Sequence, residues 1–382
     1  MVVIHVINSL CVGGIEKVVV DISNNQALLG NKVYIITLSN SNFKLKIQLN
    51  PNVEVISLPY KNNSVHSILL FWIFGIPKTI KIINRIKPNI IHSHLYYHYF
   101  LFLSLSIKFS NVFAAHFRTI HTSGLFYNST TLLNRFRLLI EKVATKIYPV
   151  YLIGVSKQIF ENNKSFFSLN ANEIRLIPNG IDLKEFSKSH FTTITKSDFG
   201  INNNTIIVTY VSRLDNGKNH YCLFNSWFKV VKVCANVHLC IVGDGNLKNT
   251  LIKQTQVLGI EKYVSFLGNL DNVAPFLSIT DIGVFPSHFE GFPVSLIEKL
   301  AMELPVITSD INVFKDVIVN NENGFICSVN DSNDYANKLI LLLENPELRI
   351  KLGKTAKELS RKYDIIEITK QTLSFYEEAL SI

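Results

Sequence analysis

Short apolar, β-branched runs alternate with longer helical patterns along this chain, and the alternation occurs in two successive series. Such alternation is typical of parallel sheets whose strands are joined by crossover helices. In the first half it predicts strands at 2–7, 32–38, 53–58, 89–92, 112–117, 150–154 and 173–177. In the second half it predicts strands at 205–211, 237–242, 263–266, 281–285, 305–308 and 324–327. We therefore expect an α/β protein with two parallel sheets.

A polar stretch from about residue 180 to 204 separates the two series. It is rich in Ser, Thr, Asn and Lys and poor in apolar periodicity, which predicts an interdomain linker. A length of 382 residues also suits two α/β domains. We place the first domain at 1–185 and the second at 186–364. The segment 365–382 is expected to be a C-terminal helix that is able to pack back on the first domain.

The cysteines and the first residues indicate the compartment. Cys11, Cys222, Cys234, Cys240 and Cys327 are odd in number and scattered, without a CxxC pair or zinc spacing. This pattern predicts a reducing compartment and no structural metal. The opening residues MVVIHVINSL lack a basic region and a cleavage site, which favours a first strand over a signal peptide. We expect a cytoplasmic protein.

Charge and the longest apolar stretches indicate which partners to expect. The stretches 67–76 and 96–107 are shorter than the roughly 20 residues that span a bilayer, so we expect buried helices. The formal net charge of +9 is compatible with nucleic acid, an anionic membrane surface or phosphate-rich substrates. Lys and Arg are spread along the chain and no nucleic-acid signature is present, so nucleic acid is the least favoured.

Glycine-rich turns follow several predicted strands, where open α/β sheets bind their ligands. Gly13 and Gly14 follow the first strand and precede a helix. Paired glycines allow a phosphate to approach the backbone, although an ordinary strand-to-helix turn is the alternative. The sequence differs from the GxGxxG dinucleotide fingerprint. Gly243-Asp244-Gly245, after the strand 237–242, is compatible with turn chemistry alone.

Two cations follow the first strand of the second half. Arg213 and Lys218 lie in the segment that leads into a helix, where the helix dipole disfavours positive charge. A bound diphosphate between them would remove this cost. The alternative is a pair of solvated surface charges.

The most specific motif is the segment 281–298, in which a strand leads into a loop and then a helix. Glu290 lies in the loop, Pro293 is well suited to open the helix, and Glu298 falls in its second turn. The E-x7-E spacing predicts two carboxylates in one strand-end crevice that bind paired hydroxyls of a sugar or ribose. A capping box with Ser287 is the alternative for Glu290, and an exposed helix position is the alternative for Glu298.

Three histidines lie at or just after predicted strand ends of the first half: His92, His94 and His121. A histidine at such a position is able to donate to a sugar hydroxyl or to a developing charge. A structural role is the alternative for each of them, most of all for His92 within its strand.

Together these residues resemble a known family, the retaining GT-B glycosyltransferases of the glycosyltransferase 4 type. The resemblance covers nearly the whole chain, and its diagnostic element is the Glu290-Gly291-Phe292-Pro293 run with Glu298. It implies two facing Rossmann-like domains with the donor between them. Further matching positions are Gly13-Gly14-x-Glu16, His92-Ser93-His94, Pro178-Asn179-Gly180-Ile181-Asp182, Arg213 with Lys218, and Gly243-Asp244-Gly245.

The resemblance also implies roles for single residues. Arg213 and Lys218 would hold the donor diphosphate, Glu298 the ribose and Glu290 the transferred sugar, with His121 near the reacting carbon. The implied catalytic set is Glu290, His121, Arg213 and Lys218. The implied donor-binding set is Gly13, Gly14, Arg213, Lys218, Gly243, Gly291, Phe292, Pro293 and Glu298.

The implied activity is hexosyl transfer with retention, from a UDP- or GDP-linked sugar to a glycan acceptor. Lipid-linked intermediates of cell-surface polysaccharide or lipopolysaccharide synthesis are the expected acceptors. Neither cofactor nor metal is expected, because cationic side chains and helix dipoles would take the leaving-group charge. Many relatives work at the inner face of a membrane, and the net charge is compatible with peripheral docking to an anionic surface. Lys299, Leu300 and Asp316 depart from residues common in the family.

Three other function classes are weighed against this one. A sugar-nucleotide epimerase of the same architecture would convert the donor without an acceptor. A binding protein with an inactive site is disfavoured by the complete set of Arg213, Lys218, Glu290 and Glu298. An NAD-dependent oxidoreductase is disfavoured because its glycine fingerprint and acidic ribose reader are missing.

Overall fold

The chain forms two compact units in the computed structural model. The structure describes residues 1–11, 13–39, 48–58, 65–95, 97–121 and 131–381. The first unit comprises Met1–Gly180 and Ile365–Ile382, and the second comprises Ile181–Asp364. The division falls after Gly180, a few residues before the boundary inferred from composition.

The first unit contains a parallel sheet of seven strands in the order β3-β2-β1-β4-β5-β6-β7. The order reverses between β1 and β4, which is the doubly wound arrangement. The strands are β1 (Val2–Ile7), β2 (Lys32–Thr37), β3 (Val53–Ser57), β4 (Ile90–Ser93), β5 (Ala115–Ile120), β6 (Val150–Gly154) and β7 (Ile174–Leu176). Its helices are α1 (Gly14–Leu28), α2 (Val65–Ile86), α3 (Tyr97–Lys108), α4 (Leu132–Ile147), α5 (Lys157–Phe167) and α13 (Ile365–Leu380).

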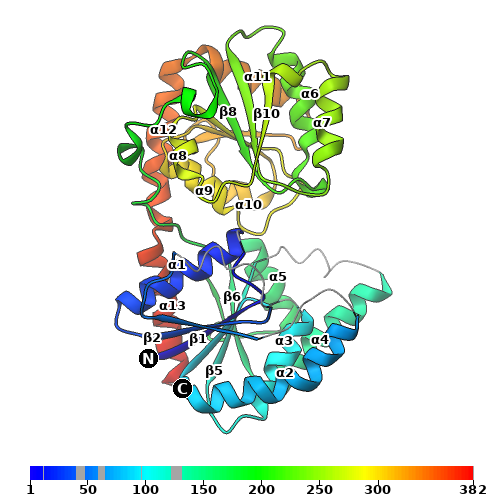
Figure 1. Cartoon of the computed structure of the whole chain (residues 1–382), viewed down its shortest axis with the longest axis vertical. Coiled ribbons are helices and arrows are strands. Elements are labelled where there is room, and N and C mark those ends of the chain that lie inside the picture. The colour runs from blue at the N-terminus through cyan, green and yellow to red at the C-terminus, as the bar shows by residue number, and fades with distance from the viewer. Residues whose placement is uncertain (12, 40–47, 59–64, 96, 122–130, 382) are drawn as a thin grey trace. The chain divides into compact units, whose positions relative to one another are not determined.

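Successive side chains of β1 face opposite layers of this unit, as the pleat of a strand requires. Val3 packs with Phe375 and Tyr376 of α13, whereas Ile4 packs with residues of α2 and α3. Figure 1 shows α1 and α13 along one side of the sheet, with α2, α3 and α4 in another group. The last helix therefore belongs to the core of the first unit although it follows the second unit in the sequence.

The second unit repeats the arrangement with six parallel strands in the order β10-β9-β8-β11-β12-β13. The strands are β8 (Ile206–Val211), β9 (Val237–Val242), β10 (Val264–Gly268), β11 (Ile282–Phe285), β12 (Val306–Ser309) and β13 (Gly324–Cys327). Its α-helices are α6 (His220–Val230), α7 (Lys248–Val257), α8 (Ala274–Ser278), α9 (Val294–Ala301), α10 (Asn312–Lys315), α11 (Ser332–Glu344) and α12 (Pro346–Ser360).

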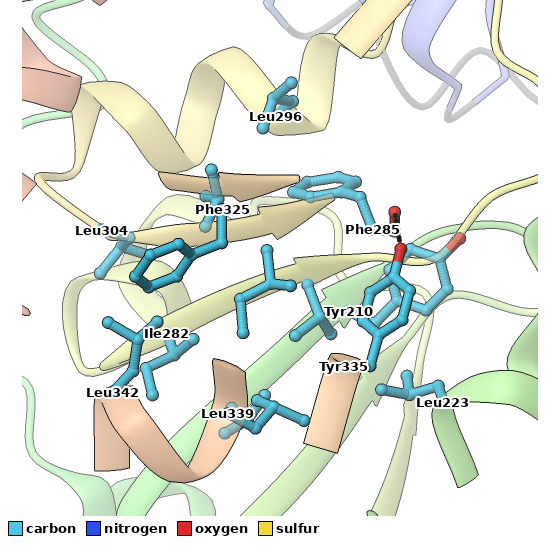
Figure 2. Close-up of a cluster of buried hydrophobic side chains, with 14 of the residues drawn as sticks. Tyr210, Leu223, Ile282, Phe285, Leu296, Leu304, Phe325, Tyr335, Leu339 and Leu342 are labelled. Carbon is cyan, nitrogen blue, oxygen red and sulfur yellow. Dashed lines mark hydrogen bonds between the residues drawn. The ribbon is translucent and has the colours of Figure 1, made fainter. Parts of the chain in front are cut away.

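The core of the second unit lies between its sheet and α6, α9 and α11. Figure 2 shows Ile282 and Phe285 of β11 beneath Leu296 of α9, with Leu339 and Leu342 of α11 on the other side. All five side chains are at most 1% exposed. This packing fixes the carboxyl ends of β8 and β11, and with them the loops that carry most of the predicted site residues.

Three expectations from the sequence need correction. The segment 180–204 is not a free linker, because Ile181, Phe186 and Ile201 are buried in the second unit. The segment contains only a few apolar residues among many polar ones, so its composition resembles that of a linker. The fifth strand begins at Ala115 and not at Val112, and it continues to Ile120 because its polar residues are buried in the sheet.

The two longest apolar stretches fall in α2 and α3, apart from Tyr96, which lies outside the described residues. Phe100 and Phe102 of α3 are fully buried, as expected. In α2, however, Ile73 and Phe74 are more than half exposed, so that helix is only partly buried. Among the described residues, the structure contains no helix with the length and apolarity needed to cross a bilayer.

Candidate functional site

The second unit brings two of the predicted site residues into direct contact at its topological switch point. The strand order reverses between β8 and β11, and open α/β sheets bind ligands at such points, beyond the carboxyl ends of the strands. Lys218 follows β8, at the end of a short 3-10 helix formed by Asn216–Lys218, and Glu290 follows β11. Lys218 Nζ lies 2.6 Å from Glu290 Oε1.

Glu290 also accepts a hydrogen bond from a serine of its own loop. Ser287 Oγ donates to Glu290 Oε1 over 2.8 Å. This bond joins two side chains, so it is not the contact of a capping box, in which each side chain bonds to the backbone N–H of the other residue. No helix begins there either, because α9 starts at Val294. The bond orients the carboxylate toward Lys218, which is a role in the site and not a helix cap.

Two buried residues outside the predicted set hold this arrangement together. The Tyr210 hydroxyl lies 3.0 Å from the carbonyl oxygen of Lys218 and 2.8 Å from Ser287 Oγ, so it joins the two loops. Asn219 donates from Nδ2 to the carbonyl oxygens of Pro286 and Val329. The tyrosine near the end of a mostly apolar strand was the signal available in the sequence.

Arg213 lies in the same segment as Lys218 but in a different environment. Its side chain is 83% exposed, and its guanidinium lies 3.4 Å from Asp215. Lys218, in contrast, is 16% exposed. Both cations thus have a carboxylate of the protein beside them, and Arg213 is the one whose side chain is open to solvent.

The glycines after β9 are required by backbone packing. Gly243 has a φ of +129°, and a Cβ there would lie 2.0 Å from the carbonyl oxygen of Ser212. A Cβ on Gly245 would lie 2.4 Å from the carbonyl oxygen of Leu214. Only glycine permits the β9 loop to lie this close to the segment after β8. Turn chemistry is therefore enough to explain why glycines stand here, together with the close approach of the β9 loop to the segment after β8.

The remaining predicted residues of the second unit lie along the connection from β11 to α9. Gly291 and Phe292 are partly buried in the loop, and Phe292 packs against Tyr363 with ring centroids 5.5 Å apart. Pro293 is the N-cap residue of α9, and Glu298 is a partly buried residue in the second turn of that helix. Of the two carboxylates of the E-x7-E motif, Glu290 thus lies in the loop and Glu298 in the helix that follows it.

In the first unit, Gly13 and Gly14 precede and open α1 as predicted, although Val12 lies outside the described residues. A Cβ on Gly14 would meet no atom within 4 Å. A Cβ on Gly13 would clash only with the flexible carboxylate of Glu16. Neither glycine is demanded by packing, so the motif is open to a ligand role.

Four histidines of the first unit, His5, His92, His94 and His121, lie close to one another on the side of the sheet covered by α1 and α13. His92, His94 and His121 line one small cavity together with Thr119. His94 Nδ1 lies 3.0 Å from His121 Nε2, and His94 Nε2 lies 3.2 Å from Nδ1 of His5. His5 was not singled out from the sequence, although a histidine inside a buried strand is an unusual feature.

Burial keeps these imidazoles neutral. It lowers the pKa of His5 to about 4 and that of His121 to about 3, and it holds the pKa values of His92 and His94 well below their ordinary value. His92, which was expected to be structural, contacts the Tyr376 hydroxyl and Thr119 Oγ1.

Ring nitrogens of His5, His92 and His94 lie within 4.8 Å of one another, which is compatible with three ligands of a metal ion. Both ring nitrogens of each of the three are hydrogen-bonded within the protein. A metal ion would have to replace these bonds, so the group fits a polar network better than a metal site.

Comparison with known proteins identifies related sequences over most of the chain. The family described as "Glycosyltransferase Family 4" matches residues 12–185, and the family described as "Glycosyl transferases group 1" matches residues 192–359. An alpha-monoglucosyldiacylglycerol synthase of Acholeplasma laidlawii is 27% identical over 368 residues, which are 92% of this chain and 90% of that protein.

A second relative is the N-acetylgalactosamine-N,N'-diacetylbacillosaminyl-diphospho-undecaprenol 4-alpha-N-acetylgalactosaminyltransferase of Campylobacter jejuni. It is 27% identical over 246 residues, 63% of this chain and 65% of that protein. The crystal structure of Anabaena Alr3699/HepE in complex with UDP and glucose matches with a TM-score of 0.82 and 16% identity, covering 97% and 98% of the two chains. That similarity shows the fold, GT-B. None of these three proteins supports the epimerase alternative.

Proposed function

Because the chain belongs to the glycosyltransferases of family 4 and group 1, we propose that it transfers a hexosyl group with retention from a nucleotide-sugar to a lipid-linked glycan. The observation that carries the proposal is the Lys218–Glu290 pair at the switch point of the second unit. It places one cation and one carboxylate where a strand-end ligand of an α/β sheet binds.

The proposed roles follow the chemistry of each group. Lys218 and the exposed Arg213 bind the diphosphate, and Glu298 binds the ribose hydroxyls. Glu290 binds hydroxyls of the transferred sugar, and His121 contacts that sugar near the reacting carbon. Gly14 and the amides that follow Gly291 complete the binding set, with Gly13, Gly243, Phe292 and Pro293 shaping the loops.

In the proposed reaction the bond between the anomeric carbon and the diphosphate oxygen breaks. The acceptor oxygen attacks from the same face, and its proton passes to the leaving phosphate oxygen. Lys218 and Arg213 stabilise the charge that develops on the diphosphate, so no bound metal is required. Both relatives are named for alpha-linked products, which retention yields from an alpha-linked donor.

UDP is the favoured nucleotide, with GDP as the second candidate, because the solved Anabaena protein binds UDP. A lipid-linked acceptor is favoured because both relatives are named for lipid substrates or products. Such acceptors would place this protein in the synthesis of cell-surface glycans, at the cytoplasmic face of the membrane.

The test is calorimetric binding of UDP and GDP without added metal. We expect wild-type protein to bind UDP, and both Arg213→Ala and Glu298→Ala to weaken that binding about tenfold or more. Lys232→Ala, which removes an exposed lysine of the same unit, is the control and should bind UDP normally. Folded wild-type protein that binds neither nucleotide would contradict the proposal.

We also propose that α4 docks the protein on an anionic membrane surface. Four apolar side chains recur with helical spacing and are 40–84% exposed: Leu132, Phe136, Leu139 and Val143. Three exposed cations accompany them on the helix: Arg135, Lys142 and Lys146. An exposed apolar stripe flanked by cations is typical of helices that lie in a membrane interface.

Vesicle flotation tests this docking. Vesicles with anionic phosphatidylglycerol should bind the wild type, and Phe136→Ser with Leu139→Ser should abolish binding. Replacing the three cations by Gln should weaken it in a salt-dependent way. Val257→Ser removes an even more exposed apolar side chain from the second unit and is the control. Binding that survives both sets of substitutions in α4 would exclude this surface.

A further inference from the structure

The side chain of Gln26 begins a continuous run of hydrogen bonds that ends at His121. Gln26 Oε1 lies 2.8 Å from His5 Nε2, His5 Nδ1 lies 3.2 Å from His94 Nε2, and His94 Nδ1 lies 3.0 Å from His121 Nε2. We call these four residues the histidine relay. Gln26, His5 and His94 are buried, and the proposed function assigns none of the three a role.

The amide oxygen of Gln26 determines the direction of the relay. An amide oxygen only accepts, so His5 donates to it from Nε2. A neutral imidazole has one donor and one acceptor, so His5 Nδ1 must accept from Nε2 of His94. By the same reasoning, His94 Nδ1 accepts from Nε2 of His121. The proton of His121 is therefore on Nε2, and its Nδ1 is a bare acceptor.

These proton positions require neutral imidazole rings and a fixed orientation of the Gln26 amide. Burial supplies the first, because it keeps the pKa values of His5, His94 and His121 far below neutral pH. The structure supplies the second, because Oε1 of Gln26, and not its amide nitrogen, is the atom that lies 2.8 Å from His5 Nε2.

The end of the relay is a buried nitrogen without a partner. His121 Nδ1 has no hydrogen-bond partner among the described residues, and His121 lines the cavity with His92, His94 and Thr119. A buried polar atom of this kind calls for an explanation, and a ligand hydroxyl is one. If each ring carried its proton on the other nitrogen, the buried Nδ1–H of His121 would have no acceptor. His5 Nε2 and Gln26 Oε1 would then face each other as two acceptors.

We infer that Gln26, acting through His5 and His94, holds His121 in the Nε2-protonated tautomer, so that Nδ1 accepts a hydrogen bond from a hydroxyl of the transferred sugar. His121 is then an acceptor and not a proton donor, because its only proton is engaged with His94. Gln26 is a positioning residue for the reaction. The identity of the ligand as a sugar rests on the proposed function, whereas the tautomer does not.

Nitrogen NMR of protein labelled with ¹⁵N-histidine tests the tautomer directly. In a neutral imidazole the protonated and the bare nitrogen resonate far apart, so the spectrum identifies which one carries the proton. We expect His121, assigned with His121→Gln, to be protonated on Nε2 in the wild type. Gln26→Met should convert this single tautomer into a mixture. Asn25→Leu changes the neighbouring position of α1 and should leave it intact.

His116 is an internal reference in the same spectra. It is buried in the same unit, but its Nε2 contacts Ser93 Oγ, and it lies outside the relay. Its tautomer should not respond to Gln26→Met. A wild-type His121 protonated on Nδ1 would overturn the inference, as would a Gln26→Met variant whose His121 tautomer is unchanged. If that variant does not fold, the wild-type spectrum still decides the direction.

Kinetics connect the tautomer to the sugar. Gln26→Met should lower kcat/KM for the nucleotide-sugar about fivefold, as expected for one neutral hydrogen bond. UDP alone should bind to it with unchanged affinity. A normal kcat/KM in a variant whose His121 tautomer has changed would contradict the role toward the sugar. A wild type that transfers no sugar would refute the proposed function and leave the tautomer result standing.

Discussion

Lys218 and Glu290 are far apart in the sequence, yet the Lys218 Nζ and Glu290 Oε1 atoms lie 2.6 Å apart, and neither side chain is more than 16% exposed. The ammonium group of Lys218 and the carboxylate of Glu290 therefore neutralise each other where both are largely shielded from solvent. Removing one member of such a pair leaves an uncompensated charge, which costs more than losing an exposed ion pair.

We predict that Lys218→Met and Glu290→Gln each lower the free energy of unfolding by about 1–3 kcal/mol. Because the two groups contact each other, the double variant should lose about 1 kcal/mol less than the sum of the single losses. Urea denaturation of the wild type and the three variants measures this coupling.

The pair Asp244–Lys248 is the control for this cycle, since its members are 47% and 36% exposed. Its coupling energy should be close to zero.

UDP calorimetry then separates the proposed roles of Lys218 and Glu290. Lys218→Met should weaken UDP binding about tenfold or more, because the diphosphate loses a cation. Glu290→Gln should affect it little, because the proposal assigns Glu290 to the sugar. Equal loss of UDP binding in both variants would refute this division.

Gly14 and Gly243 allow a matched test of binding against folding. Gly14→Ala should leave the free energy of unfolding unchanged, or raise it by up to about 0.5 kcal/mol, because its Cβ meets nothing and Ala favours helix. Gly243→Ala should lower it by more than about 2 kcal/mol, because φ is +129° and the Cβ meets the Ser212 carbonyl. Urea denaturation compares the two variants.

The proposed role of Gly14 adds a second expectation. Gly14→Ala should weaken binding of the nucleotide-sugar while stability is kept. A variant that is as stable as the wild type and binds the donor equally well would remove Gly14 from the binding set.

Lys299 is a fully buried lysine in α9, at a position where the sequence departs from the residue common in the family. Its Nζ lies 4.7 Å from the ring centroid of Phe285 and has no hydrogen-bond partner among the described residues. Burial lowers its pKa from 10.5 to about 7, with Glu298 acting in the opposite direction. The pKa of this lysine is lower in the folded than in the unfolded protein. At every pH at which the unfolded chain still binds the proton, the buried lysine therefore destabilises the folded state.

We predict that Lys299→Met raises the free energy of unfolding by about 2 kcal/mol at pH 7. The destabilisation by Lys299 is complete below the pKa of the folded state and disappears as the pH rises toward 10.5, the ordinary pKa of lysine. The stability gained by Lys299→Met should therefore be smaller at pH 9. Scanning calorimetry at both pH values measures it. Lys232→Met replaces an exposed lysine and should change stability little at either pH. A Lys299→Met variant that is less stable than the wild type at pH 7 would contradict this account.

The buried histidines of the first unit predict loss of stability in acid. Burial lowers the pKa of His5 to about 4 and that of His116 to about 3, whereas unfolded histidines take up protons near pH 6.5. Below pH 6.5 the unfolded chain thus binds more protons than the folded one, so stability falls as the pH falls. We expect each of the two to cost about 2 kcal/mol between pH 7 and pH 5.

Urea denaturation at pH 7 and pH 5, followed through Trp72 fluorescence in a Trp227→Phe background, reports on the first unit alone, because Trp72 is then the remaining tryptophan. His116→Phe removes one of the two groups and should reduce the loss by about 2 kcal/mol. Equal stability of the first unit at the two pH values would show that these histidines are not held neutral by burial.

Local sequence patterns are sufficient for most of the secondary structure. The strands β1, β6, β9 and β13 have the predicted bounds, because each is a short, mostly apolar run with polar or turn residues near its ends. The end of β5 was missed because Arg118 and Thr119 are buried polar residues that resemble the end of a run. The segment 180–204 was mistaken for a linker because a few buried apolar residues do not outweigh a polar composition.

The sequence by itself determined the fold class, the two series of strands and the residue types at the strand ends, because these follow from periodicity and turn chemistry within short windows. Only the tertiary structure decided that Glu290 contacts Lys218 and that His121 is joined through His94 and His5 to Gln26. The physical reason is that hydrogen bonds and burial act between strands and helices that are distant in the chain. A local pattern identifies which side chains stand at a sheet edge, but the strand order and the helices above it determine which of them meet.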